Sequence, residues 1–343
     1  MATQNNSPSE RRKVVVVTGA SAGVGRAVAR RFAEEGAAVG LIARGRAGLA
    51  GAAEDVSRRG GQPLVLPCDV ADAAAVQAAA DRVEAELGPI DVWVNNAMVS
   101  VFSPVRQMQV DEYRRVTEVT YLGSVHGTLA ALKYMLPRDR GTIVQVSSAL
   151  AFRSIPLQSA YCAAKHAVVG FLASLRSELF HDGSNVRVSM VHMPALNTPQ
   201  FGWVRSRLPH KGQPVPPIFQ PEVAAEAVHW ASLNAPRDLD VGASAIEAIT
   251  GNKIIPGLLD RYLGETGFDA QQTDQPRDPH APDNLFAPVD DEKDYGAHGS
   301  FDARASTECP ALWLAKHRKS LTAVAAAGLA GLAMTALGSR ARR

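Results

Sequence analysis

A short run of β-branched residues that ends in glycines lies near the start of the chain. Residues 13–25 read KVVVVTGASAGVG, and residues 26–35 place apolar side chains at helical spacing. A fully apolar strand that is followed at once by a helix is typical of a parallel sheet covered on both faces. This segment therefore predicts an α/β fold.

The alternation of strand and helix patterns continues along the chain. Further strands are predicted over residues 37–43, 63–67, 90–95, 141–147 and 186–192, with a last edge strand at 239–243. Helices are predicted over residues 48–59, 73–87, 160–180 and 221–232, and within 111–136. Repeated βα units with short connections imply a doubly wound Rossmann-type parallel sheet with helices on both faces. Ligands of such sheets bind at the carboxyl ends of the strands.

The first strand-to-helix turn has glycines in the spacing GxxxGxG, at Gly19, Gly23 and Gly25. Glycine is needed where the backbone turns tightly and where a pyrophosphate approaches with no Cβ in the way. The N-terminus of the following helix offers free N–H groups to the anion. The loop therefore predicts a dinucleotide site. Ser21 and Val24 belong to the same turn and are predicted to bind the cofactor as well.

The end of the second strand indicates which nicotinamide cofactor is bound. An acid there would accept a hydrogen bond from the adenosine ribose 2′-OH, whereas a base would bind a 2′-phosphate. The chain has Arg44 and Arg46 at this place and no acid. NADP is therefore predicted in preference to NAD, with Arg44 as the phosphate partner and Arg46 as a candidate second one. The alternative is that these arginines are solvated loop charges.

Tyr161 and Lys165 stand at i and i+4, so a helix would carry both on one face. A nearby ammonium favours phenolate and is expected to lower the tyrosine pKa from about 10. Such a tyrosine can take a proton from an alcohol, or donate one to a carbonyl, while hydride moves to or from a nicotinamide. Ser148, thirteen residues before Tyr161, follows a predicted strand and could hydrogen-bond the substrate oxygen.

These motifs together resemble the short-chain dehydrogenase/reductase family, in its classical subclass. The matching segments are TGASAGVG at 18–25, Cys68-Asp69-Val70, Asn95-Asn96-Ala97, Ser147-Ser148, and Tyr161 with Lys165. They follow the family's order and spacing over roughly residues 13–250. The resemblance implies an oxidoreductase that interconverts an alcohol and a ketone or aldehyde by hydride transfer.

The resemblance also implies roles for single residues. Tyr161 would be the general acid/base, Ser148 would polarise the substrate carbonyl, and Lys165 would hold the nicotinamide ribose. Cofactor contacts are implied for Asp69 and Val70 beside the adenine, for Ala97, and for Thr198 at the nicotinamide carboxamide, while Asn95 would stabilise the sheet beside the cofactor.

Three positions depart from the family pattern. Met98 stands where the family usually has glycine after Asn-Asn-Ala, and Ala195 replaces glycine after Pro194. Thr120 aligns with the asparagine of the family's proton relay, so it is predicted as a member of the catalytic set with an altered relay. The alternative to an enzyme is a cofactor-binding regulatory or scaffold protein with weak or no turnover.

The chain is predicted to divide into four parts. They are a disordered N-terminus (1–12), a dinucleotide-binding catalytic domain (13–267) with a substrate lid (196–220), an acidic Pro-rich connector (268–309), and a basic-flanked apolar helix (310–343). The lid carries Phe201, Trp203, Leu208, Ile218 and Phe219, which suggests a hydrophobic substrate. Packing of these side chains on the protein's own core or on a partner subunit is the alternative.

Charge and apolar content of the last two parts differ sharply. Residues 269–302 contain nine acids and two bases, and residues 310–343 contain six bases and no acid. Residues 320–339 are uncharged and long enough to span a bilayer, about 30 Å. A membrane tether, a helix packed on the protein or a partner, and a mobile tail all stay open, because alanine dominates this segment.

The net charge, the cysteines and the histidines restrict which partners and which cell compartment the sequence predicts. The 36 basic and 34 acidic residues give a net charge of +2, so no nucleic-acid partner is indicated. Three scattered cysteines and a polar first ten residues predict a reducing, cytoplasmic location, with membrane association only through the C-terminal helix. The histidines lack metal-like spacing, so no metal site is predicted. A homo-oligomer is expected from the family resemblance.

Overall fold

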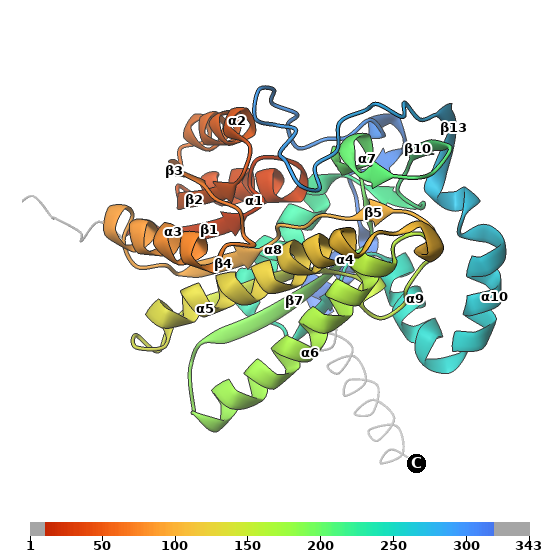
Figure 1. Cartoon of the computed structure of the whole chain (residues 1–343). Helices are drawn as coiled ribbons and strands as arrows, with labels where there is room; N and C mark the ends of the chain where they lie inside the picture. Colours follow the sequence, from red (N-terminus) through yellow and green to blue (C-terminus); the bar gives the residue numbers. More distant parts are fainter. Residues whose placement is uncertain (1–10, 319–343) are drawn as a thin grey trace, which may run out of the picture.

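A seven-stranded sheet forms the centre of the protein, in a computed structural model that describes residues 11–318 (Figure 1). The strand order is β12-β7-β6-β4-β1-β2-β3, and every pairing is parallel. The strands are β1 (Val14–Thr18), β2 (Ala38–Ala43), β3 (Gln62–Pro67), β4 (Val92–Asn95), β6 (Thr142–Ser148), β7 (Arg187–Met193) and β12 (Asp238–Asp240). The predicted doubly wound α/β fold is confirmed.

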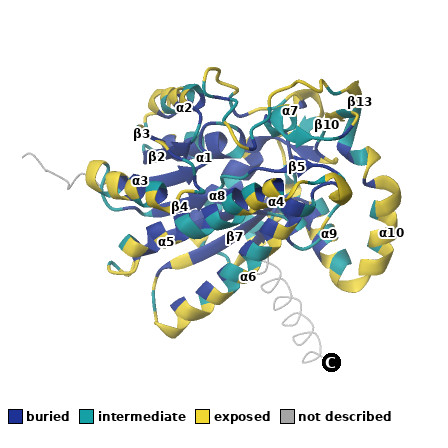
Figure 2. Ribbon diagram, in the orientation of Figure 1, coloured by how far each residue is buried: buried dark blue, intermediate teal, exposed yellow. Residues whose placement is uncertain are grey.

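Helices cover both faces of the sheet. Side chains alternate across a strand, so Val15 and Val17 of β1 face one core while Val14 and Val16 face the other. One core is closed by α1 (Gly23–Ala33), α2 (Arg46–Arg58) and α8 (Pro221–Asn234). The other core is closed by α3 (Ala73–Glu86), α5 (Gly123–Met135) and α6 (Ser159–His181). Figure 2 shows the strands as a buried layer between these helices.

The strand order reverses between β1 and β4, which places a crevice at their carboxyl ends. Polar contacts hold the two strand ends together there. The hydroxyl of Thr18 accepts hydrogen bonds from the backbone N–H groups of Asn96 (2.9 Å) and Ala97 (3.1 Å), and the Asn96 amide donates to the Thr18 carbonyl (2.9 Å). The crevice is therefore built by the segments that carry the glycine loop and the Asn-Asn-Ala motif.

The long helix predicted within residues 111–136 is interrupted. It consists of α4 (Val110–Val116), a π-helical segment (Thr117–Leu122) and α5. A π-helix inserts an extra residue into the helical turn, and such insertions occur frequently at functional sites. Thr120 lies in this segment, fully buried.

The segment of the predicted lid consists of short strands and one short helix, and two helices after it were not predicted. The lid holds β8 (Ala195–Leu196), α7 (Gln200–Trp203), β9 (Arg205–Ser206), β10 (His210–Gly212) and β11 (Ile218–Phe219), and β9 pairs with β5 (Val101–Phe102). The unpredicted helices are α9 (Ala243–Ile254) and α10 (Pro256–Thr266), which are largely exposed (Figure 2).

The acidic connector returns to the strands and loops of the predicted lid. Its strand β13 (Gln272–Pro276) pairs antiparallel with β10, and β14 (Ala305–Ser306) pairs in parallel with β11. Residues 310–318 are helical. Across residues 11–318 no helix is both long and apolar enough to cross a membrane. The predicted tether at 320–339 lies outside the described residues.

Candidate active site

The glycine loop brings backbone against backbone, and its geometry requires glycine at three positions. Gly19 and Gly23 have positive φ angles of 66° and 56°. A Cβ on Gly19 would lie 2.9 Å from the Cα of Ala97, and a Cβ on Gly25 would overlap the carbonyl oxygen of Gly19. α1 begins at Gly23 without a side-chain cap, so no capping side chain occupies the N–H groups of its first turn, and the Gly23 N–H donates to the carbonyl of Gly296 (3.1 Å). This cradle fits the phosphates of a dinucleotide.

A cleft of about 180 Å³ runs along this cradle, and we call it the cofactor cleft. Most residues predicted to bind a cofactor line it: Gly19, Ser21, Gly23, Val24, Arg44, Asp69, Val70, Ala97 and Thr198. Four other residues predicted to contact the cofactor do not line it, namely Gly25, Asn95, Tyr161 and Lys165, and neither does Arg46, the candidate second phosphate partner. Gly25 packs behind the loop, and Asn95 is buried in the sheet.

Asn95 ties β4 to α5. Its Oδ1 accepts a hydrogen bond from the Trp93 indole (2.8 Å), and its amide donates to the Thr128 hydroxyl (2.9 Å) and the Ser124 carbonyl (3.2 Å). A buried amide with these partners fixes the carboxyl end of β4. Asn95 therefore supports the end of the strand beside the predicted cofactor site and does not line the cleft itself.

Arg44 lines the cofactor cleft but is bound by the C-terminal part of the chain. It donates hydrogen bonds to the backbone carbonyls of Asn284 and of Phe286 (3.1 Å). Burial lowers the pKa of the guanidinium, while the nearby carboxylates of Asp69 and Asp290 raise it. The alternative of a solvated loop charge is therefore wrong for Arg44. Arg46 is exposed and pairs with Asp291 (2.6 Å).

Ser148, Tyr161 and Lys165 line a second cavity of about 360 Å³, which we call the substrate cavity. The Nζ of Lys165 lies 5.5 Å from the centre of the Tyr161 ring and donates to the Val146 carbonyl (2.8 Å). Five residues line both cavities: Val24, Asn96, Met98, Thr198 and Gln200. The three predicted catalytic side chains are thus brought together, next to the cofactor cleft.

Burial has the largest effect on the pKa values of Tyr161 and Lys165. It raises the pKa of Tyr161 above its ordinary value, although the hydrogen bond with Ser148 lowers it, and it lowers the pKa of Lys165 to about 8. Lys165 is not among the groups that shift this pKa, so the expected lowering of the Tyr161 pKa by Lys165 stays a prediction. Tyr161 is protonated through the neutral range, which suits a proton donor.

Thr120 lies behind the wall of the cofactor cleft, because its neighbour Val119 and its hydrogen-bond partner Val99 both line that cleft. Its hydroxyl donates to the carbonyl of Val99 (3.0 Å) and accepts from the Val99 N–H (3.1 Å). Thr120 lines neither the cofactor cleft nor the substrate cavity. The Thr120 hydroxyl thus both donates to and accepts from the backbone of Val99. The side chain therefore holds the loop after β4 in place. A role of Thr120 in a proton relay stays a prediction.

Sequence reasoning assigned no role to two residues at the junction of the cavities. Asn96 donates its amide to the carbonyls of Thr18 (2.9 Å) and Gly19 (3.3 Å), which holds the glycine loop against β4. The side chain of Met98 lies where the family has glycine, and it lines both cavities. The available signal was the Asn-Asn-Ala motif, which contains Asn96 and is followed directly by Met98.

The apolar lid side chains divide between the cavity and the core. Phe201 lines the substrate cavity. Trp203 lines the cofactor cleft and packs edge-on against Tyr295, 5.0 Å between ring centres. Leu208, Ile218 and Phe219 are buried. For these three the alternative of core packing is correct, so only part of the lid faces a substrate.

Comparisons with known proteins identify what the chain resembles. A family model described as short chain dehydrogenase matches residues 13–208. The oxidoreductase YxnA of Bacillus subtilis is 31% identical over 80% of this chain and 78% of its own, and a fatty acyl-CoA reductase of Acinetobacter baylyi is 29% identical over 69% and 79%. A crystal structure of a metagenomic short-chain oxidoreductase in complex with NADP matches with a TM-score of 0.56 and 29% identity, over 67% of this chain and 96% of that one.

Proposed function

Because the chain belongs to the short-chain dehydrogenase family, and is thus an oxidoreductase with a nicotinamide cofactor, we propose that it interconverts an alcohol and a ketone or aldehyde with NADP(H). One observation carries this proposal. Ser148, Tyr161 and Lys165 line a single cavity that adjoins the cofactor cleft through five shared residues. The cofactor, when bound, supplies or accepts the hydride.

The chain's own side chains would handle the proton and the substrate oxygen. Tyr161 is a neutral phenol near neutral pH, so it can donate a proton to a carbonyl oxygen as hydride arrives. Ser148 contacts Tyr161 and would direct the substrate oxygen toward it. Lys165, held by the Val146 carbonyl, would hold the nicotinamide ribose and keep a positive charge below about pH 8.

The walls of the substrate cavity favour an apolar substrate. Leu150, Ile155, Val215 and Leu263 contribute apolar side chains, and the cavity is closed by the lid and by α10. A relative named as a fatty acyl-CoA reductase agrees with an apolar substrate. The cavity volume of about 360 Å³ lies within the range of small-molecule sites.

A carbonyl panel tests the proposal and the substrate class. We expect NADPH oxidation with aliphatic, aromatic or steroid ketones and aldehydes, at a kcat/KM at least about tenfold above that for sugar carbonyls, because each methylene bound in an apolar pocket contributes about 10- to 200-fold. The oxidation of NADPH by the full chain would be followed by its absorbance at about 340 nm. A preference for sugars would contradict the apolar substrate, and an inert protein that still binds cofactor would support the regulatory alternative.

Arg44 is proposed to bind the adenosine 2′-phosphate. Its guanidinium lines the cofactor cleft directly after β2. We expect Arg44→Gln to weaken NADPH binding by about 10- to 100-fold, since a hydrogen bond to a charged group contributes about 1.5–3 kcal/mol. NADH binding should change less than about threefold. Equal losses for both cofactors, measured by nucleotide fluorescence titration, would refute the assignment.

A further inference from the structure

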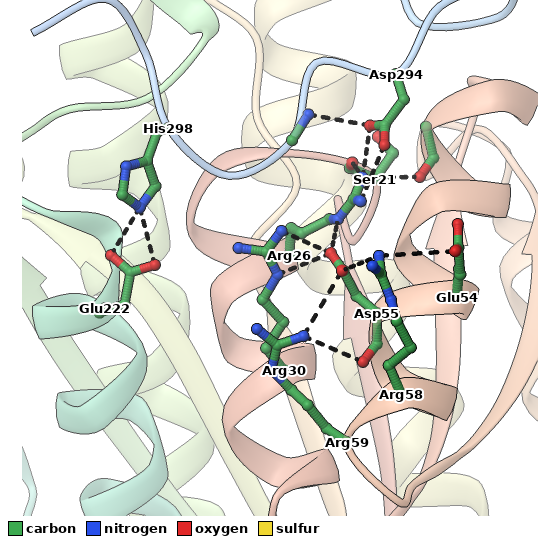
Figure 3. A network of polar contacts seen from close by, with 12 residues as sticks. Ser21, Arg26, Arg30, Glu54, Asp55, Arg58, Arg59, Glu222, Asp294 and His298 are labelled. Carbon is green, nitrogen blue, oxygen red and sulfur yellow. Dashed lines mark hydrogen bonds and ion pairs between the residues drawn. The ribbon is translucent and has the colours of Figure 1, made fainter. Parts of the chain in front are cut away.

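Residues 284–296 of the acidic connector cross the cofactor cleft, and we call them the strap. At one end, strap carbonyls accept hydrogen bonds from Arg44, and at the other end the carbonyl of Gly296 accepts from the N–H of Gly23 (3.1 Å). Figure 3 shows Asp294 of the strap reaching Arg26, which is the residue after the glycine loop (2.9 Å for Nη2 to Oδ2). The strap therefore spans from the end of β2 to the start of α1.

The strap also caps helix α2. This helix has no side-chain cap from its own N-terminal residues. Instead, the N–H of Arg46 donates to Oδ1 of Asp291 (3.1 Å), and the next two N–H groups donate to the carbonyls of Asp291 (3.2 Å) and Asp290 (3.0 Å). Uncapped helix N-termini attract anions, and here the strap supplies the acceptors.

Glycines of α2 make room for the strap carboxylates. A Cβ on Gly48 would lie 2.5 Å from Oδ2 of Asp290, and a Cβ on Gly45 would overlap Oδ1 of the same residue. Asp290 is only 7% exposed. The same Cβ on Gly48 would lie 2.9 Å from the Cβ of Ser21. The Asp290 carboxylate and Ser21 of the glycine loop are therefore both close to Gly48. Asp290 thus lies between the glycine loop and the start of α2.

Three positive features meet at this place: the N-terminus of α2, Arg44 and Arg46. Each of them suits a phosphate group, and the end of β2 is where a dinucleotide fold receives the adenosine 2′ substituent. In the structure the strap satisfies all three, through backbone carbonyls at Arg44 and through Asp291 at Arg46 and at the helix N-terminus. A 2′-phosphate would have to compete with these acceptors and would meet the carboxylate of Asp290.

We propose that Asp290 and Asp291 border the subsite of the adenosine 2′-phosphate beside Arg44 and thereby lower the affinity for NADP relative to NAD. Both acids are specificity-determining residues from the C-terminal connector: Asp290 lines the cofactor cleft, and Asp291 lies beside it at Arg46 and the start of α2. The inference rests on the proposed function, because it presupposes that the cleft binds a nicotinamide dinucleotide. NAD carries a hydroxyl at this position, which has no charge for the carboxylates to repel.

Direct titrations of the full chain with NADPH and NADH test the inference. The variants are Asp290→Asn and Asp291→Asn, which keep the shape of the side chain and the capping ability while they remove one charge. Asp278→Asn is the matched control, because it removes the same charge from the connector outside the strap. Asp290→Asn should bind NADPH about tenfold more tightly, since like charges repel strongly when they are desolvated, and Asp291→Asn should show a smaller gain because its carboxylate is partly exposed. Both variants should bind NADH within about twofold of the parent.

The outcomes separate this inference from the proposed function. An unchanged ratio of NADPH to NADH affinity in both strap variants, with both cofactors bound, would overturn the specificity role alone. Weaker NADPH binding in either variant would also overturn it, because the strap would then support the phosphate. A rise of equal size in Asp278→Asn would show a general charge effect and refute the role of the subsite. If no variant binds either cofactor, the proposed function fails and the inference falls with it.

Discussion

Replacement of Tyr161 by phenylalanine is expected to reduce carbonyl reduction about a thousandfold while cofactor affinity stays within about twofold of the parent. The half-buried phenol is the proposed proton donor of the substrate cavity, and general acid catalysis contributes about 10²- to 10⁴-fold. The ring itself remains, so the packing of α6 and the place of Lys165 should not change. Steady-state kinetics together with NADPH titration would measure both quantities.

Tyr134→Phe is the matched control for this variant. It removes the same hydroxyl from a tyrosine of α5 that contacts Asp81 rather than either cavity. A parent-like turnover in Tyr134→Phe and a loss in Tyr161→Phe would support the assignment. If Tyr161→Phe keeps more than about a tenth of the parent rate, another group donates the proton and the proposed mechanism is wrong.

Replacement of Asp55 by alanine is expected to cost about 3 kcal/mol of unfolding free energy, because it removes the centre of a buried ion-pair network. Asp55 accepts hydrogen bonds from Arg26 (2.7 Å), Arg30 (2.8 Å) and Arg58 (3.0 Å), as Figure 3 shows. Arg26 is 3% exposed, so its charge would lose a partner without gaining water. Urea unfolding of the two proteins would measure the difference.

The pH dependence of this effect has a defined sign. Burial raises the pKa of Asp55, but the guanidinium groups of Arg26 and Arg30 lower it more, so the folded-state pKa lies below the ordinary value. The stabilisation is therefore complete above about pH 4 and is lost as the pH falls below it. Glu54→Ala is the control, since this exposed neighbour makes only a 3.8 Å contact with Arg58. A cost for Asp55→Ala no larger than that for Glu54→Ala would refute the network's importance.

The local elements of the site could be predicted because each rests on residues close together in the chain. The apolar run of residues 14–18 and the glycines that follow it specify a strand, a turn and a helix within about twenty residues. Tyr161 and Lys165 share a helix face through their spacing alone. The repeated βα pattern then restricts the sheet to a parallel one, whose carboxyl edge collects these motifs.

Other parts of the site could not be predicted, because their partners are distant and follow no period. Arg44 and its acceptor Asn284 are separated by 240 positions. The acidic composition of residues 269–302 indicates a connector, but no periodicity shows that its Asp290 meets Gly45 and Gly48. The glycines at 45, 48 and 51 recur every third residue, which was the available sign that something packs on α2.

The sequence by itself therefore determined the α/β architecture, the glycine cradle and the pairing of Tyr161 with Lys165, because local periodicity and turn chemistry encode them. Only the tertiary structure decided the ionisation of Tyr161 and the partners of Arg44. Desolvation of Tyr161 depends on walls contributed by α10 and the lid, and the charge balance at Arg44 depends on the strap. The desolvation of Tyr161 and the charge balance at Arg44 each depend on many groups, and folding brings these groups together from remote parts of the chain.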